Sequence, residues 1–209
     1  MTRVVPVRDI FETNAYFHVD PATGAGFLVD PGAEAERLLR IAAERGWTIE
    51  RILLTHAHFD HTGAVAALAR AWSVPYAIHR ADIPMLADPA LNLSAPCGRL
   101  VSLADAEPLR DGDEIRLAAN PGFGLRVLHT PGHSPGSCTF LSSDEGIAFV
   151  GDTIFRGGPG TDEYPGGDGR ALARSILGRL LLLPPETRLL SGHSAPTTVA
   201  EEAPRYARR

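Results

Sequence analysis

Cysteine is scarce in this chain of 209 residues, which contains only Cys97 and Cys138. Two cysteines exclude a framework of several disulfides and a zinc site built mainly from thiolates. Free thiols are compatible with a reducing cytosol. The first residues, MTRVVPVRDIF, lack the long apolar core of a signal peptide. We therefore expect a cytoplasmic protein.

Long apolar runs and clusters of basic residues are also missing. The longest leucine-rich run, LGRLLLL, stops at Pro184 and is too short to span a bilayer. The formal net charge is −5 and the basic residues are scattered, whereas a nucleic-acid surface normally shows a basic patch. With 44% hydrophobic and 22% charged residues, the composition is that of a folded globular protein. Neither a membrane nor a nucleic acid is expected as a partner.

Strand and helix patterns alternate along the chain. Apolar β-rich runs predict strands, and apolar residues at helical spacing predict helices. Strands are predicted over residues 14–20, 26–30, 51–54, 76–79, 114–117, 125–128, 139–142, 147–150 and 188–190, and helices over 33–45, 63–72, 170–183 and a short C-terminal segment. Strands followed by helices, twice over, predict an α+β fold: an αββα four-layer sandwich of two mixed β-sheets flanked by helices. No linker divides the chain, so we expect one domain over residues 1–209.

One short segment concentrates potential metal ligands. The stretch LLTHAHFDHTG, residues 53–63, contains His56, His58, Asp60 and His61 directly after a predicted strand. Imidazole and carboxylate groups are the usual ligands of zinc and other divalent first-row metals. His56 and His58 are two residues apart, so in an extended segment their side chains point the same way. Asp60 and His61 follow on a turn, and the loop could serve two metals if further donors exist elsewhere.

Three later strand ends supply such donors. Apolar strands run into His133 within HTPGHSPGS, into Asp152 within GDTIF, and into His193 within SGH. The loops that follow strands are where sites on α/β scaffolds usually lie. These three residues are therefore predicted to join the four of the first loop.

The ordered motifs THAHFDH, PGHS, GDTIF and SGH resemble the metallo-β-lactamase fold superfamily of hydrolases. VDPG at residues 29–32, HTPGHSPGS and PGGD at residues 165–168 resemble its small glyoxalase II-like (hydroxyacylglutathione hydrolase-like) branch, and the likeness runs from about residue 14 to 198. The resemblance implies two divalent metal ions, zinc first, with iron or manganese as alternatives. It implies as ligands His56, His58 and His133 for one metal, Asp60, His61 and His193 for the other, and Asp152 as a bridge. The catalytic group would be Asp60 together with a hydroxide held between the metals.

The activity implied is a metal-dependent hydrolase, a thioesterase acting on S-lactoylglutathione or a related acyl thioester. A thiolate is a good leaving group, so no dedicated general acid is needed. The sequence departs from the glyoxalase II pattern at two places that concern glutathione binding. Only residues 194–209 follow His193, so the helical C-terminal domain of full-length glyoxalase II enzymes is expected to be absent. The arginine of the branch's GRTDF stretch is replaced at Thr161, and Arg156 or Arg170 would have to substitute for it. Substrate-binding residues stay unassigned.

Other interpretations remain open. A persulfide dioxygenase of this fold would hold one iron with His56, His133 and Asp152. A lactonase, an esterase or a β-lactamase would use the same fold, although the last generally lacks a carboxylate like Asp152. A non-catalytic metal-binding module is a further alternative.

Several polar residues outside the seven are assigned lesser roles. Asp30 in VDPG and His129 are candidates for orienting metal-bound imidazoles through contacts outside the metal ligands themselves. For Asp30, a simple Asp-Pro-Gly turn explains the residue almost as well. His18 and His79 are predicted to be structural.

Overall fold

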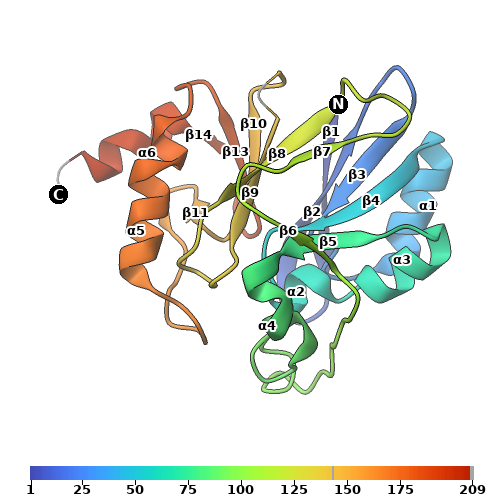
Figure 1. Cartoon of the computed structure of the whole chain (residues 1–209), viewed down its shortest axis with the longest axis horizontal. Helices are drawn as coiled ribbons and strands as arrows, with labels where there is room; N and C mark the ends of the chain where they lie inside the picture. The colour runs from blue at the N-terminus through green and yellow to red at the C-terminus, as the bar shows by residue number, and fades with distance from the viewer. Residues whose placement is uncertain (143, 208–209) are drawn as a thin grey trace.

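The computed structural model describes residues 1–142 and 144–207. Two β-sheets lie face to face between two layers of helices (Figure 1), with α1 and α3 outside one sheet and α5 and α6 outside the other. The predicted αββα sandwich is therefore confirmed.

The first sheet has the strand order β1-β2-β3-β4-β5-β6. It begins with antiparallel pairs and becomes parallel from β3 onward, because helices carry the chain back between these strands. Its elements in chain order are β1 (Thr2–Arg8), β2 (Glu12–Val19), β3 (Ala25–Val29), α1 (Ala35–Arg45), β4 (Thr48–Leu54), α2 (Phe59–Thr62), α3 (Val65–Trp72), β5 (Tyr76–His79), η1 (Arg80–Asp82), α4 (Ile83–Ala87) and β6 (Glu107–Leu109).

The second sheet has the order β14-β13-β10-β9-β8-β7. Strands β8, β10 and β13 run in the same direction, so their carboxyl ends lie at one edge of the sheet. The elements of this half are β7 (Glu114–Arg116), β8 (Gly124–His129), β9 (Cys138–Ser142), β10 (Ile147–Gly151), β11 (Ile154–Phe155), β12 (Gly158–Pro159), α5 (Gly169–Gly178), η2 (Leu180–Leu182), β13 (Arg188–Ser191), β14 (Thr197–Thr198) and α6 (Val199–Tyr206).

The observed elements differ from the predicted ones at several places, and two of these differences have a clear physical cause. The predicted helix over residues 170–183 ends at Gly178, and a separate 3₁₀ turn follows, because Arg179 has a non-helical φ of −132°. Strand β1 was not predicted. Its sequence TRVVPVR contains Pro6, which is tolerated because β1 lies at the edge of the first sheet.

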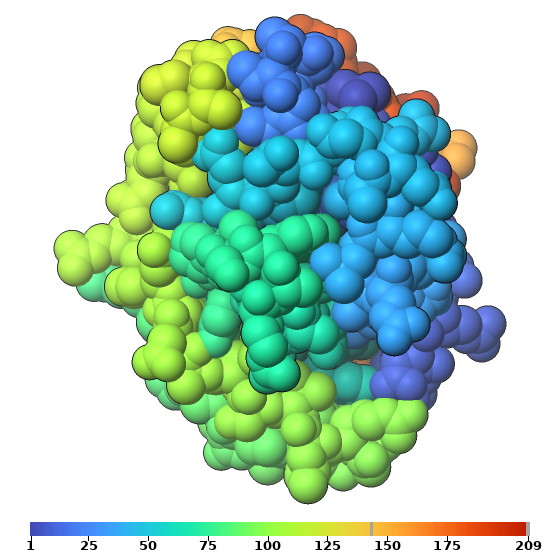
Figure 2. All heavy atoms as spheres, turned by 90° about the vertical axis from the view of Figure 1, so that its right-hand side faces the viewer, coloured from blue at the N-terminus to red at the C-terminus, as the bar shows by residue number. Residues whose placement is uncertain are grey.

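The apolar core forms three layers. Between the sheets, Phe27 and Val29 of β3 pack in the same cluster as Phe149 of β10. Leu28 points the other way, toward α1 and α3, because side chains alternate along a strand. All five residues of β3 are buried, as expected for a strand covered on both faces. Figure 2 shows the outer face formed by α1 and α3. Within the described residues, no helix is long and apolar enough to cross a membrane.

Candidate metal centre

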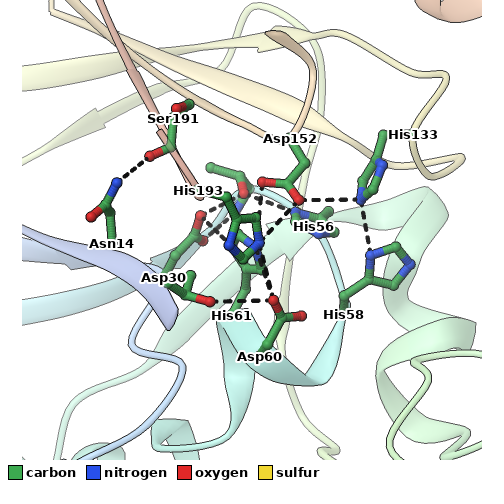
Figure 3. Close-up of polar contacts among 12 residues, drawn as sticks. Asn14, Asp30, His56, His58, Asp60, His61, His133, Asp152, Ser191 and His193 are labelled. Carbon is green, nitrogen blue, oxygen red and sulfur yellow. Dashed lines mark hydrogen bonds and ion pairs between the residues drawn. The ribbon is translucent and has the colours of Figure 1, made fainter. Parts of the chain in front are cut away.

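The first ligand loop leaves β4 in an extended conformation and then turns into the short helix α2. His56 and His58 lie in the extended part, whereas Asp60 and His61 lie on α2. The change from strand to helix places His58 beside His133 and Asp60 beside His193 (Figure 3). His56 and His61 lie close to each other near Asp152.

The first group of donors is His56, His58 and His133, all buried. His133 Nε2 lies 3.0 Å from His58 Nδ1, and one ring nitrogen of each residue lies within 4.8 Å of the others. His56 Nε2 is buried without a hydrogen-bond partner in the protein. An unpartnered buried nitrogen is costly unless something else binds it, so its position favours a metal ligand.

The second group is Asp60, His61 and His193. Asp60 Oδ2 lies 3.1 Å from His193 Nε2 and 3.7 Å from His61 Nε2, and the two ring nitrogens are 3.3 Å apart. His193 comes from the loop after β13, on the second sheet, so tertiary packing closes this group across the two sheets.

Asp152 lies between the two groups. Its Oδ1 is 3.5 Å from His61 Nε2, and its Oδ2 is 3.7 Å from His133 Nε2 and 3.3 Å from His193 Nε2. Oδ1 is buried and makes no hydrogen bond. Gly192 makes room for this carboxylate, because a Cβ there would lie 2.3 Å from Asp152 Oδ1. The seven predicted residues are thus brought together around one carboxylate.

Neighbouring acceptors orient three of the imidazoles. His61 Nδ1 lies 3.0 Å from Asp30 Oδ2, His133 Nδ1 lies 2.7 Å from the Thr161 carbonyl oxygen, and His193 Nδ1 lies 2.7 Å from the Glu12 carbonyl oxygen. Each acceptor fixes a proton on Nδ1 and turns Nε2 toward the centre.

Asp30 is also bound from the ligand loop. It accepts hydrogen bonds from the Thr55 backbone N–H and hydroxyl at 2.8 and 2.6 Å. The same carboxylate therefore connects the end of β4 to the ring of His61.

Asp82 is a buried carboxylate that the sequence reasoning missed. It accepts hydrogen bonds from the backbone N–H of Ala57 at 3.0 Å, the hydroxyl of Ser134 at 2.7 Å and the backbone N–H of Gly136 at 2.5 Å. Ala57 and Ser134 are the neighbours of predicted ligands in two different loops. Asp82 follows β5 on η1, where RAD carries no local signal that distinguishes it from a surface turn.

The remaining candidate histidines lie away from the seven. His129 Nε2 lies 2.9 Å from the Pro135 carbonyl oxygen, and its ring stacks on that of His79 at 3.9 Å. No hydrogen bond between His129 and a predicted ligand is found in the described part of the chain. His18 is buried among aromatic rings between the sheets.

The charges of the cluster separate into two sides. Burial and the neighbouring imidazoles lower the pKa of His56, and they lower the pKa of His58 to about 3. Burial also disfavours the charged form of His193, but Asp152 and Asp60 outweigh it and raise its pKa to about 10. Burial opposes ionisation of Asp152, yet His61 and His193 hold the pKa of that carboxyl well below its usual range. Without metal, His56 and His58 are neutral, whereas His193 holds a proton that a bound cation would displace.

A cavity of about 490 Å³ opens onto the cluster. Beside five predicted ligands, its walls are mostly apolar and come from loops on both sides. The further lining residues are Phe11, Glu12, Phe59, Leu93, Pro96, Cys97, Phe155, Thr161 and Tyr164.

Nitrogen and carboxylate donors, several of them buried and unpartnered, fit a pair of divalent cations. The fold and this donor set define a metal-dependent enzyme built on two packed sheets. The chain belongs to the metallo-beta-lactamase superfamily, whose family model matches residues 8–193.

Three known proteins illustrate the relationship. The hydroxyacylglutathione hydrolase GloC of Haemophilus influenzae is 32% identical, over 95% of this chain and 93% of GloC. The crystal structure of BLEG-1 B3 metallo-beta-lactamase superposes with a TM-score of 0.91 at 36% identity, covering 98% of this chain and 97% of that one. The crystal structure of TTHA1623 in a di-iron-bound form gives a TM-score of 0.84 at 40% identity, covering 96% and 97%.

Proposed function

We propose that this protein is a metal-dependent hydrolase that cleaves acyl thioesters, with S-lactoylglutathione as the first candidate substrate. The observation that carries the proposal is the position of Asp152, whose carboxylate faces both donor groups at 3.3 to 3.7 Å beneath an open cavity. A carboxylate between two cations lowers their mutual repulsion.

In this proposal His56, His58 and His133 hold one divalent ion, Asp60, His61 and His193 hold the other, and Asp152 bridges them. When bound, such a pair lowers the pKa of a water molecule and polarises an acyl carbonyl. The di-iron form of TTHA1623 supports two metals of this kind. Zinc, iron and manganese all accept nitrogen and oxygen ligands, so metal supply contributes to the choice.

The chain's own residues orient the proposed metal ligands. Few other side chains of the cavity are available for proton transfer. Asp30 and the carbonyl oxygens of Thr161 and Glu12 fix the imidazoles. A thiol has a pKa near 8.5 and departs as a thiolate at neutral pH. A thioester therefore suits a cavity in which five polar side chains are proposed ligands and the others are those of Glu12, Cys97, Thr161 and Tyr164.

The likeness to GloC supports the thioester class. This chain aligns with 93% of GloC, so a protein of that name consists almost entirely of the fold described above. Hydrolysis of an acyl-glutathione then requires no large addition to this fold.

The test is hydrolysis of S-lactoylglutathione by freshly purified protein, compared with metal-stripped protein and with samples reloaded with zinc or iron. Metal-dependent turnover is expected. Asp60→Asn should lose both metal and activity, whereas Asp144→Asn, which changes an exposed carboxylate, should lose neither. No turnover in protein shown to hold two metals would reject the substrate, and full metal content and activity in Asp60→Asn would contradict the ligand assignment.

β-Lactam hydrolysis is a second candidate, favoured by the likeness to BLEG-1 over nearly the whole of both chains. An amine leaving group needs a proton, unlike a thiolate, and the cavity offers few polar side chains beyond the proposed ligands. A chromogenic cephalosporin assayed beside the thioester decides between the two. Faster turnover of the β-lactam would replace the thioesterase proposal.

A further inference from the structure

The cavity above the metal centre is lined by an unusually apolar wall. Its members are Phe11, Phe59, Leu93, Pro96, Phe155 and Tyr164. Phe11 and Tyr164 are 49% and 44% exposed at the rim, where large apolar side chains gain little unless something covers them.

No lysine or arginine lines this cavity among the residues that the structure describes, and Glu12 adds a negative side chain. The loop of residues 88–100, which forms one wall, does carry Arg99. That guanidinium donates two hydrogen bonds of 2.8 Å to the carboxylate of Asp9, so its charge is already paired. A substrate carboxylate would find no free cation on the wall, and bidentate pairing with arginine is the usual way to bind one.

The Asp9–Arg99 pair also connects the two segments that contribute to the wall. Asp9 lies in the turn between β1 and β2, two residues before Phe11, and Arg99 lies in the loop that carries Leu93. In Figure 2 the light green atoms of this loop lie at the bottom of the molecule, beside the dark blue atoms of the β1–β2 turn.

Leu93 is held in this wall against its backbone preference. Its φ is 69°, in the left-handed region that leucine rarely adopts. The buried neighbours Asn92 and Ser94 impose this conformation: Asn92 donates to the Val101 carbonyl oxygen at 2.8 Å and accepts from the Ser94 N–H at 3.0 Å. The Asn92 carbonyl oxygen also accepts from the Phe59 N–H at 3.0 Å, which fastens the loop to the start of α2. Unfavourable backbone geometry retained at a cavity wall points to a functional role for the side chain.

We infer that the cleft selects acyl thioesters with an apolar acyl group and an uncharged thiol portion, and that Leu93 determines this specificity. The inference rests on the proposed thioesterase function. Burial of the apolar acyl group against Phe11, Leu93 and Tyr164 supplies the selectivity, because transfer of apolar surface out of water is favourable and roughly proportional to area.

Four thioesters test this selectivity by crossing two acyl groups with two thiols. Phenylacetyl and lactoyl groups are each joined to glutathione and to N-acetylcysteamine, which is neutral. The phenylacetyl compounds should show a kcat/KM at least ten times that of the lactoyl compounds, a difference of about 1.4 kcal/mol. Replacing glutathione by N-acetylcysteamine should raise kcat/KM or leave it unchanged. A smaller acyl preference, or a lower kcat/KM for the N-acetylcysteamine compounds, would overturn the inference.

The variant Leu93→Asn tests the role of the side chain, because asparagine tolerates the left-handed conformation. Its preference for phenylacetyl over lactoyl should fall at least fivefold, with metal content and circular dichroism unchanged. Leu91→Asn, which alters an exposed leucine of the same loop outside the cavity, is the matched control and should keep the preference. If Leu93→Asn does not fold, Leu93→Gly replaces it, because glycine also tolerates the left-handed conformation. An unchanged preference in a folded variant would refute the assignment.

A binding measurement separates this inference from the catalytic proposal. S-benzyl-N-acetylcysteamine is a thioether that cannot be hydrolysed, and calorimetry should find it at least ten times tighter than its S-methyl analogue. If metal-loaded protein hydrolyses none of the four thioesters, the thioesterase proposal fails. If it hydrolyses them but prefers S-lactoylglutathione, only the selectivity inference fails.

Discussion

Replacing Asp82 tests whether one buried carboxylate holds the two ligand loops in register. In Asp82→Ala the backbone N–H groups of Ala57 and Gly136 lose their acceptor inside the protein. Each buried unsatisfied donor costs about 1 to 3 kcal/mol. The hydroxyl of Ser134 loses less, because Ser137 Oγ lies 2.7 Å away and offers an alternative partner. The expected loss in the free energy of unfolding is therefore about 2 to 6 kcal/mol, a large part of a typical total.

Asp82→Asn should destabilise the protein less than Asp82→Ala. The amide oxygen of asparagine still accepts a hydrogen bond in place of one carboxylate oxygen, whereas its NH₂ group faces a hydrogen-bond donor. We expect a loss of about 1 to 3 kcal/mol. Metal affinity should fall about 10- to 100-fold in both variants, because His58 and His133 lie on the two loops that Asp82 joins.

The assay is urea unfolding with and without chelator, together with competitive metal titration. Asp88→Ala, which removes an exposed carboxylate that accepts a hydrogen bond from the nearby Ala90 N–H, is the control and should cost no more than about 1 kcal/mol. The proposed connection between the loops would be refuted if Asp82→Ala had a free energy of unfolding within about 1 kcal/mol of that of the parent protein and bound metal equally well.

Three further perturbations have defined outcomes. Asp152→Ala should reduce bound metal from two ions to one or none, measured by atomic emission, and lower activity at least about a hundredfold; two retained metals would contradict its bridging role. Gly32→Ala should displace α2, because the new Cβ would lie 1.6 Å from the Asp60 carbonyl oxygen, and metal titration should find the second site lost. Burial lowers the pKa of His18 to about 4 in the folded protein. As pH falls, the unfolded chain therefore takes up the His18 proton before the folded protein does. The free energy of unfolding then declines between about pH 6.5 and pH 4. This decline, about 3 kcal/mol when complete, should be absent in unfolding curves of His18→Leu, and an identical pH dependence would show that His18 is not its source.

Much of the fold was readable from the sequence because its signals are local. The alternation of apolar residues in the predicted strands and the helical spacing over residues 33–45 follow from the geometry of strands and helices. Prediction failed where local signals conflicted. Pro6 argues against a strand, yet β1 forms at the edge of the sheet, where proline is tolerated. The leucines around Arg179 predicted a helix that continues past its observed end at Gly178.

The donors of the candidate site were also readable, because HAHFDH and the three later motifs follow apolar strands directly. Their supporting partners were not. His193 is oriented by the carbonyl oxygen of Glu12, 181 positions away, and Asp82 bonds to two loops from a turn without a motif.

Residue type and short spacing were thus enough to name the candidate metal ligands and the strands that precede them. The packing of the sheets and loops brings these donors into overlapping groups around Asp152 and places Phe11 and Leu93 on one cavity wall. Such contacts join residues that are far apart in the sequence. They depend on how the two sheets and their loops pack, which no local pattern encodes.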